Sequence, residues 1–317
     1  MVIITFTANP SLDRSAPLAR DLRVARLNRL GQVYRLASGK GVNVSAAVHA
    51  AGHPTLAIVP VDTSDPLAEA LRRRGVPSRM VPVGHRARTN LSITHPDGST
   101  TRFIEPGEPL TPENQTALVS TLLASLPGAS WLALCGSLPP GAPVDWYVKL
   151  TEMAHSVGVR VAVDADGPAL DAVISHAHAT PPDLLSPNVA ELQKATGRSI
   201  RKAVKAGDLQ PAIDAVQELH NRGVPRVLAT LGPQGALLSC EDGLWHAEPD
   251  PVQPVSVMGA GDAALAGCLL ISTRTQDPAL CLDRAVAYGT ATVLKPGSEV
   301  PTPADADAIS LTVRKLA

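Results

Sequence analysis

The sequence predicts a three-layer α/β/α protein, in which helices cover both faces of a mostly parallel central sheet and a small β-sheet forms a lid. Short apolar runs alternate with longer helical stretches along most of the 317 residues, and such runs suit strands that are buried on both faces. Two segments, 11–35 and 86–104, alternate polar and apolar residues instead, which favours strands outside the main sheet. We therefore expect one domain over residues 1–317, with a discontinuous lid at 11–35 and 86–104.

The candidate strands of the central sheet are, in chain order, Val2 to Thr7, Thr55 to Val61, Trp131 to Cys135, Val159 to Val163, Asp183 to Leu185 and Arg226 to Thr230. The helical stretches among them are Val42 to Ala51, Pro66 to Arg74, Pro112 to Ser125, Val144 to Val157 and Pro211 to Arg222. Several of these stretches are followed by glycine, which helix C-termini prefer. Within the lid, Asp97-Gly98 predicts a hairpin turn between Asn90 to His95 and Thr100 to Ile104,.

Composition excludes several classes of function. The formal net charge is −1 and the chain holds three Trp, three Tyr and two Phe, so neither a basic surface nor stacking platforms for nucleic acid are expected. The sequence lacks a run of apolar residues long enough to span a membrane, and its first residues lack the pattern of a signal peptide. The four cysteines are widely spaced without a metal-binding pattern, which favours reduced thiols and a cytoplasmic location.

The sharpest local signal is a glycine-rich turn, Gly259-Ala260-Gly261-Asp262, which follows the β-type run Val255 to Val257 and leads into a helix of small residues. Amides at the start of a helix point toward an anion. Asp262 then has two interpretations. It is either a carboxylate stabilised by the helix dipole, or a general base that takes a proton from a substrate hydroxyl while the amides of residues 259–261 hold a phosphoryl group.

The same turn satisfies the loose dinucleotide fingerprint G-x-G-x-x-G/A,. That fingerprint requires a strand after the helix. Here the helical stretch Ala263 to Thr273 is followed by a second one, Ala279 to Leu294, without a strand between them. The order of elements therefore argues against a dinucleotide site.

A second turn, Ser38-Gly39-Lys40-Gly41-Val42-Asn43, precedes another helix. A Walker nucleotide site is excluded because Gly41 follows the lysine and the upstream glycine of that motif is missing,. The turn can still offer free amides and one cation to a ligand phosphate, or it is an ordinary capped loop.

Other polar loops follow predicted strands, and the carboxyl ends of parallel strands meet at one edge of a sheet, where α/β proteins bind ligands. Each loop alone is an ordinary connection, but together they predict a site. In one of them, Asn188 and Glu191 are three residues apart and share a helix face, a suitable way to hold Mg²⁺ through waters. These loops are Asn9 to Asp13, Cys135 to Gly141 with Ser137, Ser186 to Leu192, and Thr230 to Ala236 with Gly232 and Gly235.

With these motifs in this order, the whole chain resembles the ribokinase-like (PfkB) carbohydrate kinases. The most specific element is the pair formed by Gly39 to Asn43 and Val257 to Asp262. Within the family, Arg88-Thr89-Asn90 and Phe103 to Gly107 are similar to stretches of 1-phosphofructokinases and tagatose-6-phosphate kinases. The resemblance implies a ribokinase-like fold and ATP-dependent phosphorylation of a hexose monophosphate, with fructose 1-phosphate as the first candidate and fructose 1,6-bisphosphate as its product.

The resemblance also implies a role for each residue that matches the family's motifs. Asp262 would be the general base, and the turn Gly259, Ala260, Gly261 the anion hole. The sugar phosphate would be bound by Asp13, Gly39, Lys40, Asn43, Arg88, Asn90 and Ser137. ATP would contact Asn188, Thr230, Gly232, Gly235 and Gly261, with Mg²⁺ at Asn188 and Glu191. A monovalent cation (K⁺) beside the Gly259 turn and a homodimer formed through the lid are further expectations.

The chain departs from the family pattern at three positions. Ser38 replaces a frequent glycine, Ser186 replaces a lysine that usually precedes Pro-Asn, and Asp166 stands where Ser or Thr is more usual. The change at 186 removes a positive charge and the change at 166 adds a negative charge on the expected nucleotide side, and both are unfavourable for ATP. Tagatose 6-phosphate and fructose 6-phosphate stay open as alternative acceptors, and so does a protein that binds a sugar phosphate without turning it over.

Overall fold

The computed structural model describes residues 1–297 and 299–316 and shows two sheets. The larger sheet has ten strands in the order β14-β13-β12-β11-β10-β9-β8-β1-β4-β5. Its strands are β1 (Val2–Thr7), β4 (Thr55–Pro60), β5 (Ser78–Val81), β8 (Ala129–Cys135), β9 (Arg160–Asp164), β10 (Leu184–Leu185), β11 (Val227–Thr230), β12 (Ala236–Cys240), β13 (Gly243–Pro249) and β14 (Leu311–Lys315).

The order of the strands reverses at β1, which has β4 on one side and β8 on the other. Phe6 of β1 lies opposite Ile58 of β4 and Leu134 of β8, and both pairings are parallel. From β1 the chain runs outward to β4 and β5, then returns across β1 to β8 and onward to β11. Such a reversal opens a crevice at the carboxyl ends of the strands, where open α/β sheets bind ligands.

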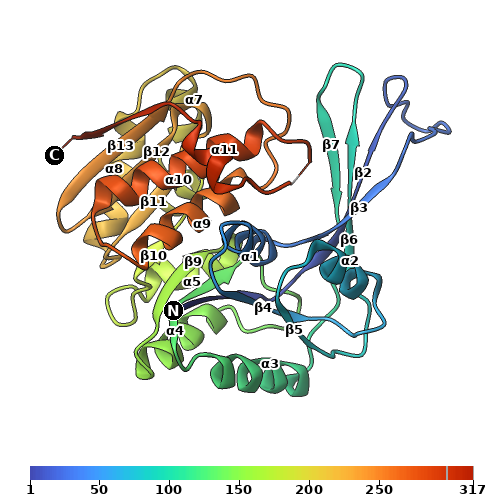
Figure 1. The fold of residues 1–317 in the computed structure, drawn as a ribbon, viewed down its shortest axis with the longest axis horizontal. Coiled ribbons are helices and arrows are strands. Elements are labelled where there is room, and N and C mark those ends of the chain that lie inside the picture. Colours follow the sequence, from blue (N-terminus) through green and yellow to red (C-terminus); the bar gives the residue numbers. More distant parts are fainter. Residues whose placement is uncertain (298, 317) are drawn as a thin grey trace.

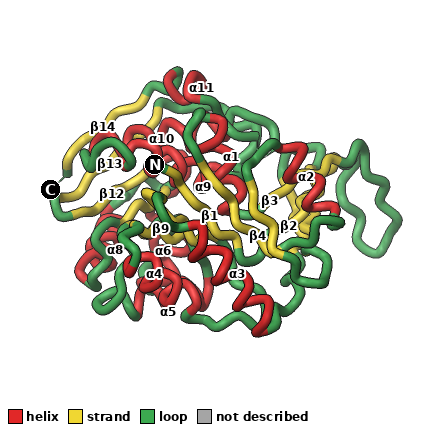
Figure 2. The backbone as a smooth tube through the Cα atoms, turned by 60° about the horizontal axis from the view of Figure 1, so that its bottom comes forward, coloured by secondary structure: helices red, strands yellow, loops and turns green. Residues whose placement is uncertain are grey.

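Helices cover both faces of this sheet, as Figures 1 and 2 show. On one face, Leu118, Tyr147 and Val216 belong to one buried apolar cluster with the sheet. On the other, Val44 and Leu265 belong to a second cluster. The helices are α1 (Lys40–Ala50), α2 (Pro66–Arg74), α3 (Pro112–Ser125), α4 (Trp146–Ser156), α5 (Gly167–Ser175), α6 (Val189–Thr196), α7 (Ile200–Lys205), α8 (Gln210–Asn221), α9 (Ala260–Ser272), α10 (Pro278–Val293) and α11 (Pro303–Asp307).

The second sheet stands out from one end of the main sheet (Figure 1). Its order is β3-β2-β6-β7, with β2 (Ser11–Pro17), β3 (Tyr34–Ser38), β6 (Arg88–Thr94) and β7 (Thr100–Ile104). Strands β2 and β6 are parallel and bring Asp13 opposite Asn90, while β6 and β7 form the hairpin predicted at Asp97-Gly98. The predicted fold class is confirmed: three layers with a mostly parallel central sheet and a small β-sheet beside it.

Some predicted elements differ from the structure. The run Val255 to Val257 is not a strand: both valines are exposed, and the amides of Val255 and Ser256 bond to the carbonyl of Val293 at the end of α10. The run is therefore a connection held by a helix end. The antiparallel strands β12, β13 and β14 were not predicted. By contrast, α9 leads directly to α10, as predicted. The strand that a dinucleotide fingerprint requires after its helix is therefore missing between them.

Two properties of the described residues bear on the excluded classes. None of the helices in residues 1–297 and 299–316 combines the length and apolar character needed to cross a bilayer. The four cysteines, Cys135, Cys240, Cys268 and Cys281, are free and buried, as expected for reduced thiols.

Candidate active site

Asp262 lies in the first turn of α9 and is buried, with 8% of its surface exposed. The helix begins after Gly259, whose φ of 77° lies in the left-handed region that glycine adopts easily,. The residues that follow are small, so α9 packs closely on its neighbours. The side-chain amide of Asn43, in α1, donates a hydrogen bond of 2.7 Å from Nδ2 to Asp262 Oδ2. A carboxylate is thereby fixed where helix amides converge.

Lys40, the first residue of α1, is bound by two carboxylates. Its Nζ lies 2.7 Å from Asp164 Oδ1, at the end of β9, and 3.0 Å from Glu191 Oε1, in α6. Burial on its own would lower the pKa of Lys40, but attraction to Asp164 and Glu191 outweighs it, so this pKa is raised. Lys40 therefore stays charged and joins the start of α1 to the other half of the sheet.

The glycines on either side of Lys40 let α1 begin close against β1. Gly39 has a φ of 131°, and a Cβ there would lie 2.7 Å from Thr7 Cγ2. A Cβ at Gly41 would overlap Thr7 Oγ1. These glycines therefore have a packing role that is independent of any ligand.

The charges around Asp262 act in opposite directions. Burial raises the pKa of this carboxyl above its ordinary value, while the positive charges of Lys40 and Arg74 and the hydrogen bond from Asn43 lower it again. The carboxyl of Asp164 has a raised pKa too, because it is buried and because Asp262 is close, and Lys40 only partly offsets this. The site thus holds acidic groups whose charge depends on nearby cations.

On the lid side, Asp13 is held by two neighbours. Ser11 donates from Oγ to Asp13 Oδ1 at 2.7 Å, and Asn90 donates from Nδ2 to the same oxygen at 2.9 Å. The other side-chain atom of Asn90, the acceptor Oδ1, is buried without a hydrogen-bond partner. A buried acceptor left in this way can bind a hydroxyl group. Asp13 and Asn90 thus present oxygen atoms on one face of the lid.

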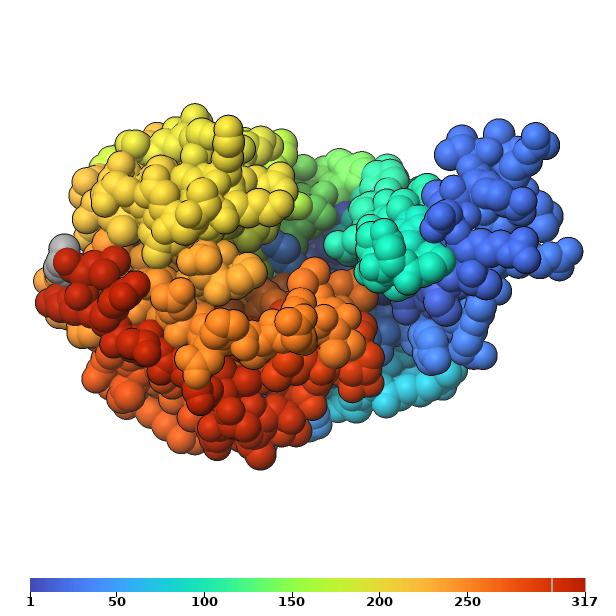
Figure 3. All heavy atoms as spheres, turned by 90° about the horizontal axis from the view of Figure 1, so that it is seen from above, coloured from blue at the N-terminus to red at the C-terminus, as the bar shows by residue number. Residues whose placement is uncertain are grey.

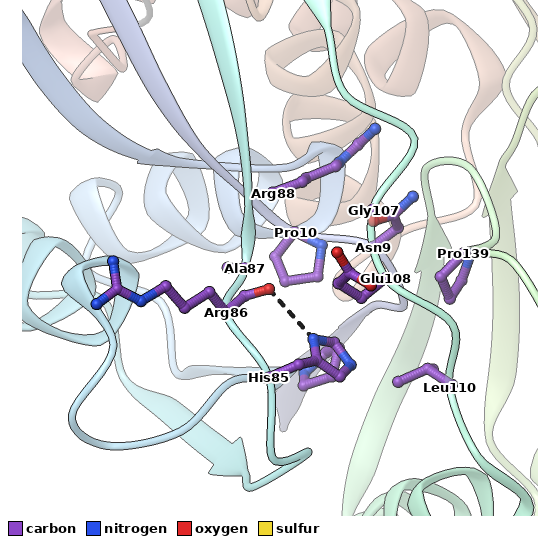
Figure 4. Close-up of a pocket in the computed structure, with 11 residues that line it drawn as sticks. Asn9, Pro10, His85, Arg86, Ala87, Arg88, Gly107, Glu108, Leu110 and Pro139 are labelled. Atoms are coloured by element: carbon purple, nitrogen blue, oxygen red, sulfur yellow. Dashed lines mark hydrogen bonds between the residues drawn. The ribbon is translucent and has the colours of Figure 1, made fainter.

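Arg88 begins β6 and donates from Nη1 to the carbonyl of Glu105 at 3.0 Å, while its Nε is buried without a partner. Burial lowers the pKa of Arg88, against the attraction of Asp13, Asp166 and Glu105. Figure 4 shows Arg88 with Asn9 and Gly107 around a small hollow of about 20 Å³, the size of one water molecule. The hollow is too small for a sugar. The feature of this region that can bind a ligand is the guanidinium of Arg88.

The predicted nucleotide side is built around the start of α6. Asn188 caps this helix by accepting bonds from the amides of Ala190 and Glu191, and Glu191 accepts one from the amide of Asn188 in return. Thr230 pairs with Asn188 in a short parallel bridge. Gly232 is exposed and Gly235 is buried; a Cβ at Gly235 would overlap the carbonyl oxygen of Ala247. Gly235 is therefore needed for packing against β13.

The structure brings the predicted site residues into two linked groups. Lys40, Asn43 and Asp262 form one with Glu191, and the lid residues Asp13, Arg88 and Asn90 form the other. Ser137 is held by neither group; its Oγ accepts a hydrogen bond of 3.4 Å from Asn9, which precedes β2. Viewed from above, a hollow opens between the green and yellow middle part of the chain and its orange C-terminal part, and the teal lid hairpin lies beside it (Figure 3).

The structure shows the environment of two residues that depart from the family pattern, Ser186 and Asp166. Ser186 is buried at the end of β10, where its amide bonds to the carbonyl of Val163. Asp166 precedes α5 without capping it by a side-chain bond, and its charge acts on Arg88.

Two residues of this site were missed from the sequence. Asp164 follows a predicted strand, so its position at the sheet edge was a usable signal. Arg74 is the last of three consecutive arginines in α2, and the sequence gives no reason to single it out. Its guanidinium donates from Nη1 to Asn43 Oδ1 at 2.8 Å and to the carbonyl of Ala37 at 2.7 Å.

A doubly wound sheet with a β-sheet lid beside its carboxyl edge, and a buried aspartate at the start of a helix below it, defines the ribokinase-like class of fold. The family model for pfkB family carbohydrate kinases matches residues 11–305. The chain belongs to this family.

Known proteins resemble it over nearly its full length. The 1-phosphofructokinase of Rhodobacter capsulatus is 30% identical over 315 residues, which cover 98% of this chain and 96% of that protein. Phosphofructokinase-2 from Escherichia coli, solved in complex with substrates and products, has a TM-score of 0.85 at 28% identity and covers 97% of both chains. A possible 1-phosphofructokinase from Thermotoga maritima, at 21% identity and 100% coverage of both chains, has a TM-score of 0.83 and supports the fold.

Proposed function

We propose that this protein is a sugar-phosphate kinase that transfers the γ-phosphoryl group of ATP to a hexose monophosphate, with fructose 1-phosphate as the first candidate and fructose 1,6-bisphosphate as its product. The observation that carries the proposal is Asp262, buried at the start of α9 and held by Asn43 at 2.7 Å. The 30% identity to a 1-phosphofructokinase supports the choice of acceptor.

In the proposed reaction, Asp262 accepts the proton of the sugar's C6 hydroxyl as its oxygen attacks the γ-phosphorus. The bond from that phosphorus to the bridging oxygen of ADP breaks, and ADP leaves with the electron pair. The amides of Gly259, Ala260 and Gly261 stabilise the negative charge of the group in transit. This is catalysis by positioning and electrostatics, as phosphoryl transfer requires.

The substrate's phosphate needs a cation on the sugar side, and we assign Arg88 to it. The atom that supports this is Arg88 Nε, buried without a partner. Asp13, Asn43, Asn90 and Ser137 would hold the sugar hydroxyls, with the backbone of Gly39 beside them. Lys40 was also expected to bind this phosphate, but such a role requires its bonds to Asp164 and Glu191 to open.

ATP would lie along the carboxyl edge near Asn188, Thr230, Gly232 and Gly235, with its γ-phosphate at Gly261. Mg²⁺ usually keeps several waters and binds through one or two carboxylates and the substrate's phosphates. Glu191 fits that role only through water, because one of its oxygens accepts from Lys40 and the other from the Asn188 amide. For K⁺, the support is a crystal structure of Escherichia coli phosphofructokinase-2 in complex with potassium.

Fructose 6-phosphate is the second candidate acceptor. Escherichia coli phosphofructokinase-2, 27% identical to this chain, was crystallised in complex with fructose-6-phosphate. Tagatose 6-phosphate presents the same combination of a phosphate for Arg88 and a hydroxyl for Asp262. The alternative of another class is a protein that binds a sugar phosphate without turning it over. The presence of Asp262 argues against this alternative.

A coupled assay that detects ADP, run with magnesium ATP and each of the three sugar phosphates, tests the proposal. We expect the highest kcat/KM with fructose 1-phosphate. For Asp262→Asn we expect kcat to fall ~10²- to 10⁴-fold, as is typical when a general base is removed, while binding of the sugar phosphate persists. Asp283→Asn, at a partly exposed position of α10, is the control. Equal inactivity on all three sugars, or a normal rate in Asp262→Asn, would contradict the proposal.

We also propose a homodimer formed through the lid. Large apolar side chains lie exposed on it: Val24, Leu27, Tyr34, Phe103 and Ile104. Large apolar side chains left exposed on a small sheet favour an interaction surface. Escherichia coli phosphofructokinase-2 has a tetrameric inhibited form, so assembly occurs in a relative. Sedimentation equilibrium should give twice the mass of the chain, and Phe103→Asp with Ile104→Asp should give a monomer.

A further inference from the structure

Arg74 connects three parts of the molecule that meet at the candidate active site. It is the last residue of α2. Its guanidinium bonds to the side chain of Asn43, in α1, at 2.8 Å and to the carbonyl of Ala37, in the lid strand β3, at 2.7 Å. Asn43 in turn bonds to Asp262, in α9, at 2.7 Å. A continuous hydrogen-bonded chain therefore runs from α2 to the carboxylate of Asp262.

The chemistry of the groups determines which atom donates and which accepts in each of these hydrogen bonds. A guanidinium has only donors, so it must face the amide oxygen of Asn43. The amide nitrogen, Nδ2, is then turned toward Asp262 and donates to Oδ2. Without the guanidinium, either end of the Asn43 amide could face the carboxylate, and the oxygen end would repel it. Among the described residues, Asp262 Oδ1 accepts no side-chain hydrogen bond, so this oxygen is available to a substrate hydroxyl.

The charge of Arg74 acts on the same carboxylate. Burial lowers the pKa of Arg74 to about 10, although Asp262 and Asp13 oppose this, so the guanidinium is charged at neutral pH. Its positive charge is among the influences that lower the pKa of Asp262, against the effect of burial. The ionisable groups that act on Asp262 are Lys40 of α1, Arg74 of α2, Cys135 of β8, Asp164 of β9 and Glu191 of α6.

We propose that Arg74 is a positioning residue for phosphoryl transfer: it orients the Asn43 amide and, through it, the carboxylate of Asp262. The inference rests on the proposed function, in which Asp262 is the base. Because the same guanidinium holds the carbonyl of Ala37, the orientation of the base is tied to the inner end of lid strand β3. In this role Arg74 acts through Asn43 and not on the reacting atoms.

Kinetics of Arg74→Met and Arg74→Lys, with Arg73→Met as matched control, test this inference. Arg73 lies on the same helix but is exposed and pairs with Glu69. We expect kcat of Arg74→Met to fall ~10- to 100-fold, the scale of a misplaced catalytic group, with little change in the KM for ATP. The acid limb of its kcat/KM profile should move to higher pH because a cation near Asp262 is lost. Arg74→Lys, which keeps the charge, should retain the pH profile and recover part of kcat.

A double-mutant cycle with Asn43→Ala distinguishes a positioning role of Arg74 from a purely structural one. If Arg74 acts through Asn43, the two substitutions together should lower kcat hardly more than Asn43→Ala alone. Wild-type kcat and pH profile in Arg74→Met, or a loss explained by its melting temperature alone, would overturn the inference. If Arg74→Met does not fold, Arg74→Lys replaces it in the cycle. A loss of kcat in Arg74→Lys that adds in full to the loss in Asn43→Ala would overturn the inference.

The Asp262→Asn variant separates this inference from the proposed function. An active Asp262→Asn enzyme would overturn both. An inactive Asp262→Asn enzyme together with a normal Arg74→Met enzyme would overturn the role of Arg74 and leave the proposed function standing.

Discussion

The ammonium of Lys40 lies 2.7 Å from the carboxylate of Asp164, although the two residues are 124 positions apart in the chain. The contact joins the first turn of α1 to the end of β9, across the point where the strand order reverses. Glu191 completes the group at 3.0 Å. One cation therefore neutralises two carboxylates that would otherwise repel each other and Asp262.

Removal of this cation should destabilise the protein. Breaking a buried ion pair costs about 3–5 kcal/mol, and we expect about 2–3 kcal/mol for Lys40→Met because Lys40 is partly exposed. The loss should be larger at pH 8 than at pH 5. Asp164 has a raised pKa in the folded protein, so the folded state binds a proton more tightly than the unfolded one and loses stability as pH rises through that pKa. Urea unfolding at both pH values measures this, with Lys40→Arg as the control that keeps the charge.

The pH dependence of the reaction should reflect the burial of Asp262. The proposed base works only when ionised, so kcat/KM should fall as pH drops through its pKa. That pKa is raised above 3.8, the ordinary value of an aspartate; the acid limb should lie correspondingly higher. A profile of kcat/KM against pH checks this, and Asn43→Ala, which removes a stabilising hydrogen bond, should move the limb further up. A limb below 3.8, or one that Asn43→Ala moves down, would contradict the assignment.

Two alanine substitutions in α9 should separate function from stability. A Cβ at Gly261 would meet nothing within 4 Å, so Gly261→Ala should leave the melting temperature unchanged or slightly higher, since alanine favours helices. Its methyl group would nevertheless stand where the phosphoryl group approaches, and kcat should fall at least tenfold. At Gly267, a Cβ would overlap the carbonyl oxygen of Arg284, so Gly267→Ala should cost about 1–3 kcal/mol of stability. A fully active Gly261→Ala enzyme would remove Gly261 from the site.

Arg88→Ala should raise the KM for the sugar phosphate and leave the KM for ATP nearly unchanged. A charge-assisted hydrogen bond to a phosphate contributes about 1.5–3 kcal/mol, which corresponds to a rise of about 10- to 150-fold in KM. Steady-state kinetics with each substrate varied in turn provide the measurement, and Arg86→Ala, a neighbouring arginine, is the control. A change confined to the KM for ATP would mean that Arg88 faces the other ligand.

The sequence was sufficient for the fold class and for the two glycine-rich turns, because strand and helix periodicity and the glycine spacing are local properties. Contacts between residues far apart in the sequence could not be predicted from it. Lys40 was assigned to a ligand phosphate since nothing local indicates Asp164 as its partner. Arg74 could not be told apart from Arg72 and Arg73, because only the packing of α2 beside β3 brings it to Ala37 and Asn43. Strand β12 was missed although all five of its residues are buried, because its Ala, Leu, Ser and Cys residues include none of the β-branched or aromatic types that mark strands.

The parallel pairing of β2 with β6 constrains how the molecule folds. The segments lie opposite each other from Ser11 and Arg88 onward, and the chain between them contains α1, β4, α2 and β5. Parallel strands so far apart in sequence meet only after a large loop has closed, and pairing of this kind is slow. We therefore expect the lid to assemble only after the intervening α1, β4, α2 and β5 have packed together. A partly folded chain in which α2 and β5 have yet to pack would lack the pairing of Asp13 with Asn90, so sugar-phosphate binding should appear only after this half of the core has formed.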